Sequence, residues 1–300
     1  MKLRAPTLDD LPELAVFFEQ LHQYGTGGAS EAELRDWFTN EMLDPELDFR
    51  AAFVDGGIVG WCDVWDRDRS GQCFWLDVRA HPRVEATYET LLEFGLQRTR
   101  EQAGEDAVAR VLVAPDDEAL AGSARRRAFR PVRYAFRMEM DLVEELARPR
   151  WPEGISVRSY RAEEARTVYE LESEIFAADW NFTKLDFADW CRLYLGSTEF
   201  DPRLWFVAES ASEVVGLALC RSERRPEVGH IGVLGVKPGW RGRGLGLALL
   251  LHSSAELRAH GRSRVDLGVD AENTTGALRL YERAGMRVAE RTDTYEKALS

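Results

Sequence analysis

One segment, residues 230–251, limits the possible folds of this chain most strongly. Residues 231–236 are apolar or glycine, Pro238 ends this run, and an almost wholly apolar stretch follows before Gly261. This order predicts a buried strand, a tight turn and a buried helix. The turn carries glycines at 242, 244 and 246. Because glycine has no Cβ atom, backbone N–H groups at the start of the helix can face an anion such as a phosphate.

Two common phosphate-binding loops do not fit this turn. A P-loop ends in Gly-Lys-Ser/Thr, whereas this loop ends in Gly246-Leu247-Ala248. A dinucleotide-binding loop needs a third glycine at position 247 and a Rossmann βα unit before it, and the sequence shows neither. What remains is Arg-x-x-Gly-x-Gly at 241–246, after a Leu-Gly-Val strand end. This pattern closely resembles motif A of the GNAT superfamily of acyl-CoA-dependent N-acyltransferases; an ordinary glycine-rich turn is the alternative.

The resemblance implies a site for an acyl-CoA, with acetyl-CoA as the expected co-substrate. The loop amides would hold the pyrophosphate, and backbone groups of the strand end would line the pantetheine arm and the thioester. The implied cofactor-binding residues are Leu234, Gly235, Val236, Arg241, Gly242, Arg243, Gly244, Leu245, Gly246, Leu247 and Asn273. No metal is expected, because the four cysteines lack metal-ligand spacing and neighbouring histidines.

A second segment, residues 273–286, supports the resemblance. It is similar to the superfamily's Asn-x-x-Ala-x-x-Leu-Tyr-x-x-x-Gly-Phe, with Met286 in place of Phe and one extra residue before Ala277. Asn273 suits a helix N-cap and could also reach the cofactor. Tyr281 follows in the expected helix. The resemblance makes Tyr281 the general acid toward the departing thiolate, and packing against the sheet is the alternative.

Acylation of an amine by a thioester also needs a base, because a free alkylamine is mostly protonated at pH 7. His230 lies six residues before Val236, where the superfamily often places a carboxylate. Histidine titrates near working pH, so we expect His230 to be the base. Glu227 is the alternative base, and an ordinary hydrogen-bonded role is the alternative for His230. Backbone N–H groups at 234–236 would stabilise the charge that develops on the carbonyl oxygen.

The two halves of the chain repeat one plan. A short strand, a polar turn and an amphipathic helix begin at Lys2 and again at Ser156, with Arg158 lying 154 positions after Arg4. Farther on, an offset of 158 places Ala86 at Gly244, Tyr88 at Gly246 and Arg83 at Arg241. An offset of 157 then places Ala124 at Tyr281. Cβ atoms and a ring would then occupy the phosphate space. The first half therefore keeps the framework without the chemistry.

The expected fold is α/β (α+β), with two tandem GNAT-like domains, each a mixed, mostly antiparallel sheet flanked by helices. Residues 1–145 would form a degenerate domain without bound cofactor and residues 155–300 the catalytic domain with the acyl-CoA site. Residues 146–154 carry two prolines and a glycine and would form a linker. The layout resembles the mycothiol synthases, which usually carry Glu where this chain has His230.

Composition narrows the partners. The net charge of −13 argues against nucleic acid, no apolar run is long enough to span a membrane, and the N-terminus lacks a secretory apolar region. We therefore expect a cytoplasmic N-acetyltransferase that acetylates a primary amine of a small molecule by direct attack on the thioester. A non-catalytic acyl-CoA sensor and a mycothiol synthase-like enzyme are the alternatives. Aromatic residues between 176 and 190 fall where the superfamily builds its acceptor pocket, with packing as the alternative. The sequence gives neither the acceptor nor the oligomeric state.

Overall fold

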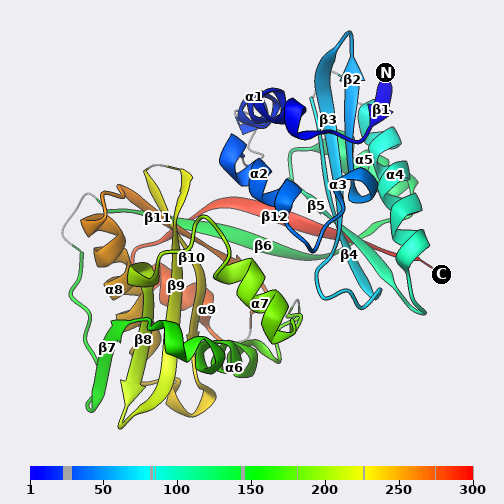
Figure 1. Cartoon of the computed structure of the whole chain (residues 1–300). Helices are drawn as coiled ribbons and strands as arrows, with labels where there is room; N and C mark the ends of the chain where they lie inside the picture. The colour runs from blue at the N-terminus through cyan, green and yellow to red at the C-terminus, as the bar shows by residue number, and fades with distance from the viewer. Residues whose placement is uncertain are drawn as a thin grey trace. The chain divides into compact units, whose positions relative to one another are not determined.

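The computed structural model describes residues 1–22, 29–81, 84, 86–142, 146–180, 182–225, 227–273 and 275–299. Its contacts divide the chain into two units (Figure 1): Met1–Tyr134 with Arg291–Ser300, and Ala135–Glu290. Each unit is a mixed sheet with helices packed against it. This is the fold class that the sequence predicts. No helix in the described part of the chain is long and apolar enough to cross a membrane.

The first unit contains six strands in the order β1-β2-β3-β4-β5-β12. All neighbours are antiparallel except β4 and β5, which are parallel. The strands are β1 (Lys2–Arg4), β2 (Phe49–Val54), β3 (Gly57–Asp66), β4 (Cys73–Ala80), β5 (Val108–Val113) and the end of β12 (Arg287–Ala298). The helices are η1 (Leu8–Asp10), α1 (Leu11–His22), α2 (Glu31–Thr39), α3 (Pro45–Asp48), α4 (Ala86–Gln102) and α5 (Glu118–Arg126).

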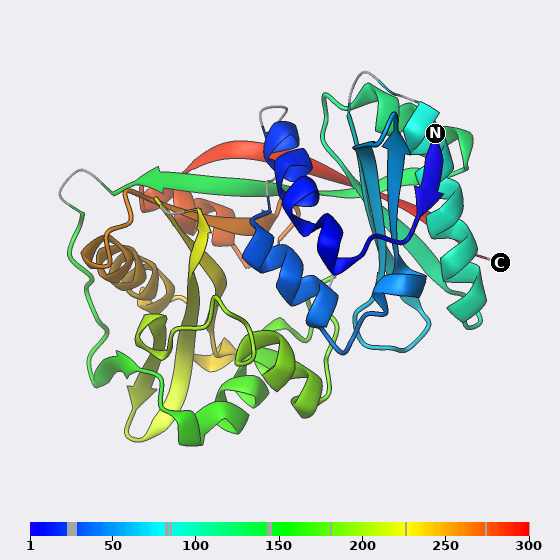
Figure 2. The same ribbon diagram turned by 45° about the horizontal axis from the view of Figure 1, so that its top comes forward.

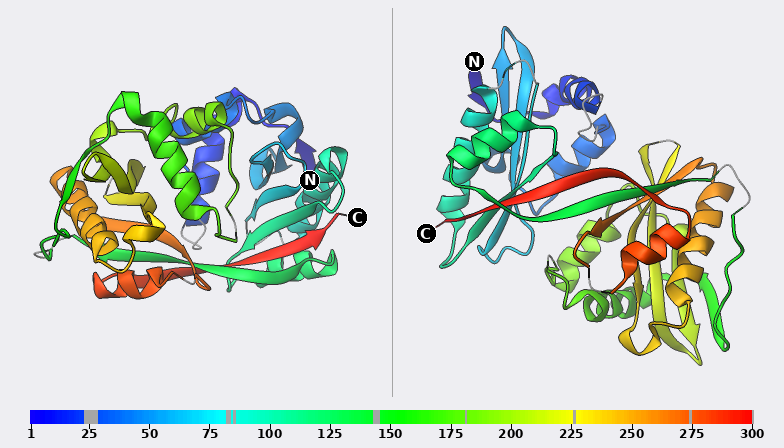
Figure 3. Two further views of the ribbon diagram at one scale, coloured as in Figure 1. Left: turned by 90° about the horizontal axis from the view of Figure 1, so that it is seen from below. Right: turned by 180° about the vertical axis from the view of Figure 1, so that it is seen from behind.

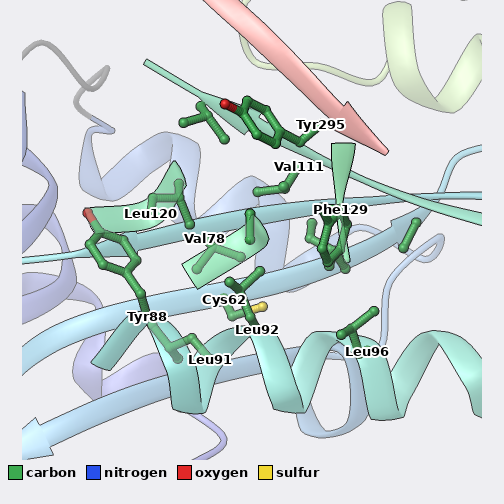
Figure 4. Packing of buried hydrophobic residues seen from close by; sticks show 14 of the residues in the cluster. Cys62, Val78, Tyr88, Leu91, Leu92, Leu96, Val111, Leu120, Phe129 and Tyr295 are labelled. Carbon is green, nitrogen blue, oxygen red and sulfur yellow. The ribbon is translucent and has the colours of Figure 1, made fainter. Parts of the chain in front are cut away.

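Alternation along β4 builds the core of the first unit. Every second side chain of β4 is buried, because successive residues of a strand point to opposite faces. Val78 of this buried set packs in one cluster with Leu92 of α4 and Val111 of β5 (Figure 4). Figure 2 shows α1 and α2 on one face of this sheet and α4 on the other.

The second unit repeats this arrangement, in the order β6-β11-β10-β9-β8-β7. Here β10 and β11 are the parallel pair. The strands are β6 (Arg130–Asp141), β7 (Ile155–Ser159), β8 (Trp205–Ser210), β9 (Glu213–Arg225), β10 (Val228–Val236) and β11 (Arg264–Asp270). The helices are η2 (Ala162–Glu164), α6 (Ala165–Phe176), α7 (Phe187–Tyr194), η3 (Pro202–Leu204), η4 (Pro238–Trp240), α8 (Leu245–Ala259) and α9 (Ala277–Arg283). Figure 3 shows α8 and α9 on the same face of the sheet, where they share one apolar cluster; α6 and α7 share another.

One local ion pair recurs in both halves. Arg4 makes a two-pronged pair with Asp10 at 2.8 and 2.7 Å, and Arg158 makes the same pair with Glu164 at 2.7 and 2.7 Å. Each pair joins the first strand of its half to the following 3₁₀ turn. The recurrence of this ion pair at the predicted offset of 154 residues supports the duplication.

The end of the last helix is also repeated. The N–H of Phe129 donates to the carbonyl of Ala124, and the N–H of Met286 donates to that of Tyr281, both at 3.0 Å. The residues before them, Ala128 and Gly285, are both left-handed, with φ of 63° and 96°. These bonds close a helix C-terminus with a left-handed residue. The structure therefore places Ala124 and Tyr281 at equivalent positions.

The contact units differ from the two halves of the sequence at their last strands. β6 pairs with β11 from Ala135↔Asp270 to Asp141↔Arg264, and β12 pairs with β5 from Asp293↔Val113 to Ala298↔Val108. The halves thus exchange their final strands, which a division at residues 146–154 does not anticipate. Antiparallel backbone hydrogen bonds are the same for either strand, so the local sequence carries no signal for the exchange. The boundaries 1–145 and 155–300 stay a proposal about the repeat.

Candidate functional site

The parallel pair of the second unit opens into a wedge. β10 and β11 pair only through Val228↔Arg264, Gly229↔Val265 and His230↔Asp266. β10 nevertheless continues to Val236 and β11 to Asp270. On its other side β10 shows register shifts between Val228 and His230 and between Ile231 and Val233. Such bulges bend a strand, so the two strands diverge past His230 and leave backbone groups available to a ligand. We call this opening the strand wedge; its apex is the pair His230 and Asp266.

The glycine loop before α8 forms an open anion cradle. Gly242 and Gly244 are left-handed, with φ of 77° and 85°, and a Cβ atom built on either would meet no other atom within 4 Å. Gly244 is the N-cap of α8, and no side chain caps this helix end. The first N–H groups of a helix have no partner within the helix, and its dipole favours an anion there. The loop therefore has the geometry to accept an anion at this helix end.

Gly246 has a different reason to be glycine. A Cβ atom at this position would lie 3.1 Å from Cδ1 of Leu280 and 3.7 Å from Cγ2 of Val236. The lack of a side chain lets α8 pack closely on α9 and on the end of β10. Leu245 beside it is buried and Leu247 half-buried, so the loop offers the backbone of these residues.

The two arginines of the loop have separate roles. The Arg241 guanidinium donates to the carbonyl of Val236 at 3.1 Å and to that of Ile175 at 3.1 Å, which ties the loop to the end of β10 and to the last turn of α6. Arg243 is exposed, lies over the ring of Trp240 at 4.7 Å and donates to the carbonyl of Gly239 at 3.2 Å. Arg241 thus shapes the loop, and Arg243 places a positive charge at its mouth.

The strand end before the loop keeps α6 close to the wedge. A Cβ atom on Gly235 would lie 2.7 Å from Cγ2 of Ile175, which real contacts do not allow. Leu234 and Val236 are half-buried and pack against the α8 side of the sheet. Their strand is hydrogen-bonded to β9 through Ala218, Leu217 and Gly216.

His230 lies at the apex of the wedge with a carboxylate partner. Its Nδ1 is 2.7 Å from Oδ1 of Asp266, and the two side chains are 26% and 11% exposed. The sequence analysis did not identify Asp266; its only local signal is a carboxylate between the apolar residues Val265 and Leu267. Glu227, the alternative base, is exposed in the turn before β10, nine residues from Val236. Because β10 and β11 are paired from Val228 to His230, Glu227 lies on the far side of this paired stretch from the opening.

Tyr281 lies in α9 and is 7% exposed. Burial, with a smaller contribution from the negative charge of Asp179, raises the pKa of its phenol to about 12. A phenol with this pKa stays protonated at working pH, as a proton donor must.

The predicted N-cap role of Asn273 is wrong. The N-cap of α9 is Gly276, which is left-handed with φ of 82°. Asn273 instead accepts from the backbone N–H of Thr275 at 2.8 Å, within the turn between β11 and α9. Asn273 therefore lies three residues before the cap, where its side chain stabilises the turn and not the start of α9.

The equivalent region of the first half is filled. Tyr88 is 4% exposed, and its hydroxyl donates to Oδ2 of Asp117 at 2.8 Å and lies 3.3 Å from the carbonyl of Ala80 at the end of β4. Ala124, at the position of Tyr281, is fully buried. Ala86 begins α4, and Arg83 lies outside the described residues.

The aromatic residues after α6 serve packing in large part. The rings of Phe176 and Phe182 stack with centroids 6.4 Å apart, and buried Trp190 donates to Oε2 of Glu172 at 2.6 Å. Trp180 is 37% exposed, and Asn181 lies outside the described residues. Across the described ranges, no cluster of three or more His, Cys, Asp or Glu side chains could hold a metal.

Comparison with known proteins agrees with this geometry. The sequence model of the Acetyltransferase (GNAT) family matches residues 165–286. A mycothiol acetyltransferase of Streptomyces griseus is 30% identical over 247 residues, which are 79% of this chain and 76% of that protein. A mycothiol acetyltransferase of Thermobispora bispora is 35% identical over 166 residues, which are 51% of this chain and 53% of that protein. The match to this and to other such proteins thus spans about half of their length.

Solved structures share the fold over the whole chain. A GCN5-related N-acetyltransferase from Sphaerobacter thermophilus has a TM-score of 0.83 at 28% identity and covers 99% of this chain and 95% of its own. A tandem GNAT protein from the clavulanic acid biosynthesis pathway has a TM-score of 0.73 at 16% identity, over 100% and 98% of the two chains. The second likeness concerns the fold alone.

Proposed function

Because the chain belongs to the GNAT family of acetyltransferases, we propose that it transfers the acetyl group of acetyl-CoA to a primary amine of a small molecule, in the strand wedge of its second unit. The observation that carries this proposal is the alignment of three features along one opening. The anion cradle at Gly242 and Gly244 follows the end of β10, His230 with Asp266 lies at the apex, and Tyr281 shares one apolar cluster with the strand ends around Leu234 and Leu267.

The cradle suits coenzyme A in particular. Backbone N–H groups of residues 242–247 would hold the pyrophosphate, with Arg243 adding charge and Arg241 fixing the loop. Backbone groups of Leu234, Gly235 and Val236 would hold the pantetheine arm. Asn273 would contribute only through the turn that it stabilises. The bound acetyl-CoA supplies an activated acyl group whose thiol can leave.

His230 and Tyr281 would move the two protons of the reaction. His230 accepts a proton from the ammonium group of the acceptor, directly or through water, so that the nitrogen lone pair can attack the carbonyl carbon. A C–N bond forms, the C–S bond breaks, and the nitrogen loses a second proton, which replaces, directly or through water, the one that Tyr281 gives up. The strand N–H groups near Leu234 stabilise the negative oxygen in between. Tyr281 gives its proton to the departing sulfur, and the pKa of about 12 keeps that proton available.

The first half would contribute no second acetyl-CoA site. Tyr88 and its bond to Asp117 occupy the space at the end of β4, and Ala124 provides no acid. We therefore propose one co-substrate site per chain. From the net charge of −13 and the composition we also propose a cytoplasmic location and no nucleic-acid partner. The acceptor of the mycothiol acetyltransferases is the first acceptor to test, because one of them is 30% identical over 79% of this chain.

The test is amine-dependent release of thiol from acetyl-CoA by the purified chain. A panel of primary amines, including the acceptor of the mycothiol acetyltransferases, is expected to contain at least one that stimulates release well above the rate without amine. A chain that binds acetyl-CoA but releases no thiol with any amine would instead be a non-catalytic sensor.

A further inference from the structure

Four polar side chains form a row across the second unit's sheet at the apex of the wedge. His230 is the register partner of Arg221 on β9 and of Asp266 on β11, and Asp266 is the partner of Glu139 on β6. Residues opposite one another in neighbouring strands point to the same face. Arg221 lies over the ring of Tyr194 in α7 at 5.6 Å, which identifies this face as the one that α7 covers.

Both oxygens of Asp266 are engaged. Oδ1 lies 2.7 Å from Nδ1 of His230, and Oδ2 accepts from Nη1 of Arg137 on β6 at 3.3 Å. Arg137 is in turn held by Glu290, at 3.0 Å from Nε and 2.6 Å from Nη2, and it lies 3.4 Å from Glu139. Asp266 is buried, and its carboxylate is therefore fixed between a histidine and an arginine.

This arrangement decides which nitrogen of His230 carries the proton. An ionised carboxylate only accepts hydrogen bonds, so Nδ1 of the neutral imidazole must be the protonated nitrogen. Nε2 then keeps its lone pair and can accept a proton from an amine. With no partner at Nδ1, the imidazole would be free to carry its proton on Nε2. Nε2 would then have no lone pair with which to accept a proton from the amine.

We propose that Asp266 is the positioning residue that fixes His230 as a base at Nε2, and that Arg137 locks Asp266 in place. This inference rests on the proposed acetyl transfer, in which His230 takes the acceptor's proton. It also gives the first half a part in the reaction, because Arg137 precedes the predicted linker in the sequence and reaches the site through the exchanged strand β6.

The structure makes the effect of Asp266→Asn specific. Arginine can only donate, so it selects the amide orientation in which the oxygen of Asn faces Arg137. The NH₂ group then faces Nδ1 of His230 and donates to it. The proton of the neutral imidazole is thereby forced onto Nε2, and the base is lost without any change in shape.

The tautomer can be read by ¹⁵N NMR of the full-length chain with ¹⁵N-labelled histidine, whether or not an acceptor amine is known. The chain has five histidines, and a His230→Gln variant assigns the signal. The neutral imidazole of His230 is expected to carry its proton on Nδ1 in the unaltered chain and on Nε2 in Asp266→Asn. Asp141→Asn is the matched control, because this exposed carboxylate on β6 contacts Arg264 and Arg287. The control is expected to keep the original tautomer.

Kinetics then connect the tautomer to the reaction. Asp266→Asn is expected to lower kcat by roughly 10²-fold, the lower end of a general-base contribution, with the KM for acetyl-CoA unchanged. A proton on Nε2 of His230 in the unaltered chain overturns the inference, and this measurement does not need the variant to fold. A folded Asp266→Asn variant with an unchanged tautomer or an unchanged kcat also overturns it. A chain without acetyltransferase activity would refute the proposed function instead, and the NMR result would still stand on its own.

Discussion

Replacing Tyr281 by Phe tests the proton donor with little disturbance of the fold. The side chain is 7% exposed within the cluster that α8 and α9 share, and Phe keeps its ring. Within the described part of the chain, its hydroxyl has no hydrogen-bond partner, so the substitution leaves no buried group unsatisfied. We expect the free energy of unfolding to change by less than about 1 kcal/mol.

The expected loss lies in turnover. Without a proton donor, kcat should fall roughly 10²-fold, which corresponds to about 2.7 kcal/mol of transition-state stabilisation, while the affinity for acetyl-CoA stays the same. The raised pKa adds a pH signature. With a pKa of about 12, about 1% of the phenol is ionised at pH 10, against about half for an ordinary tyrosine.

Steady-state rates with an identified acceptor, measured from pH 6 to about pH 10.5, check both points. The unaltered enzyme should show no loss of kcat from ionisation of Tyr281 in this range, because a raised pKa preserves the acid as the pH rises. A Phe variant that retains the kcat of the unaltered enzyme would refute the assignment. A fall in kcat centred near pH 10 that disappears in the Phe variant would refute the effect of burial.

Two further predictions concern the cradle and its filled counterpart. Gly244→Val should abolish coenzyme A binding, because φ of 85° is strained for a side chain and the Cβ would enter the cradle. Gly239→Val is the control and should keep binding, since a Cβ there also meets no atom. Titration calorimetry of the unaltered chain should give one site per chain, and two sites would contradict a filled first half. Tyr88→Phe removes the bond to Asp117 and should lower the free energy of unfolding by about 1–3 kcal/mol, measured by urea denaturation. Its kcat should be unchanged, and a loss of activity would show that the first half has a catalytic role beyond β6.

The sequence predicted those features that depend on neighbours in the chain. The glycine turn depends on backbone conformation over a few residues, and in the structure Gly242 and Gly244 are left-handed with open space where a Cβ would lie. The repeat was visible because a strand, a polar turn and a helix follow one another directly from Lys2 and again from Ser156. Even here the local pattern misled at Asn273, because the N-cap of α9 is Gly276.

Features that depend on strand register were not predictable. Asp266 and Arg137 lie 36 and 93 positions from His230, and only the pairing of β10, β11 and β6 brings them together. The contact between Arg241 and Ile175 was not predictable for a related reason, because Ile175 lies on α6, 66 residues away. The exchange of β6 and β12 had no local signal, since backbone hydrogen bonds do not identify the strand that makes them.

The most direct test of the account is product formation by a chain in which both proton carriers are removed. Mass spectrometry should show one acetylated amine for each thiol released by the unaltered chain. His230→Gln combined with Tyr281→Phe is expected to bind acetyl-CoA with unchanged affinity and to form product at least roughly 10²-fold more slowly than the unaltered chain, because the acetyl-CoA site and the strand N–H groups remain. Product formation at the rate of the unaltered chain would contradict the claim that acetyl transfer takes place between His230 and Tyr281 in the strand wedge.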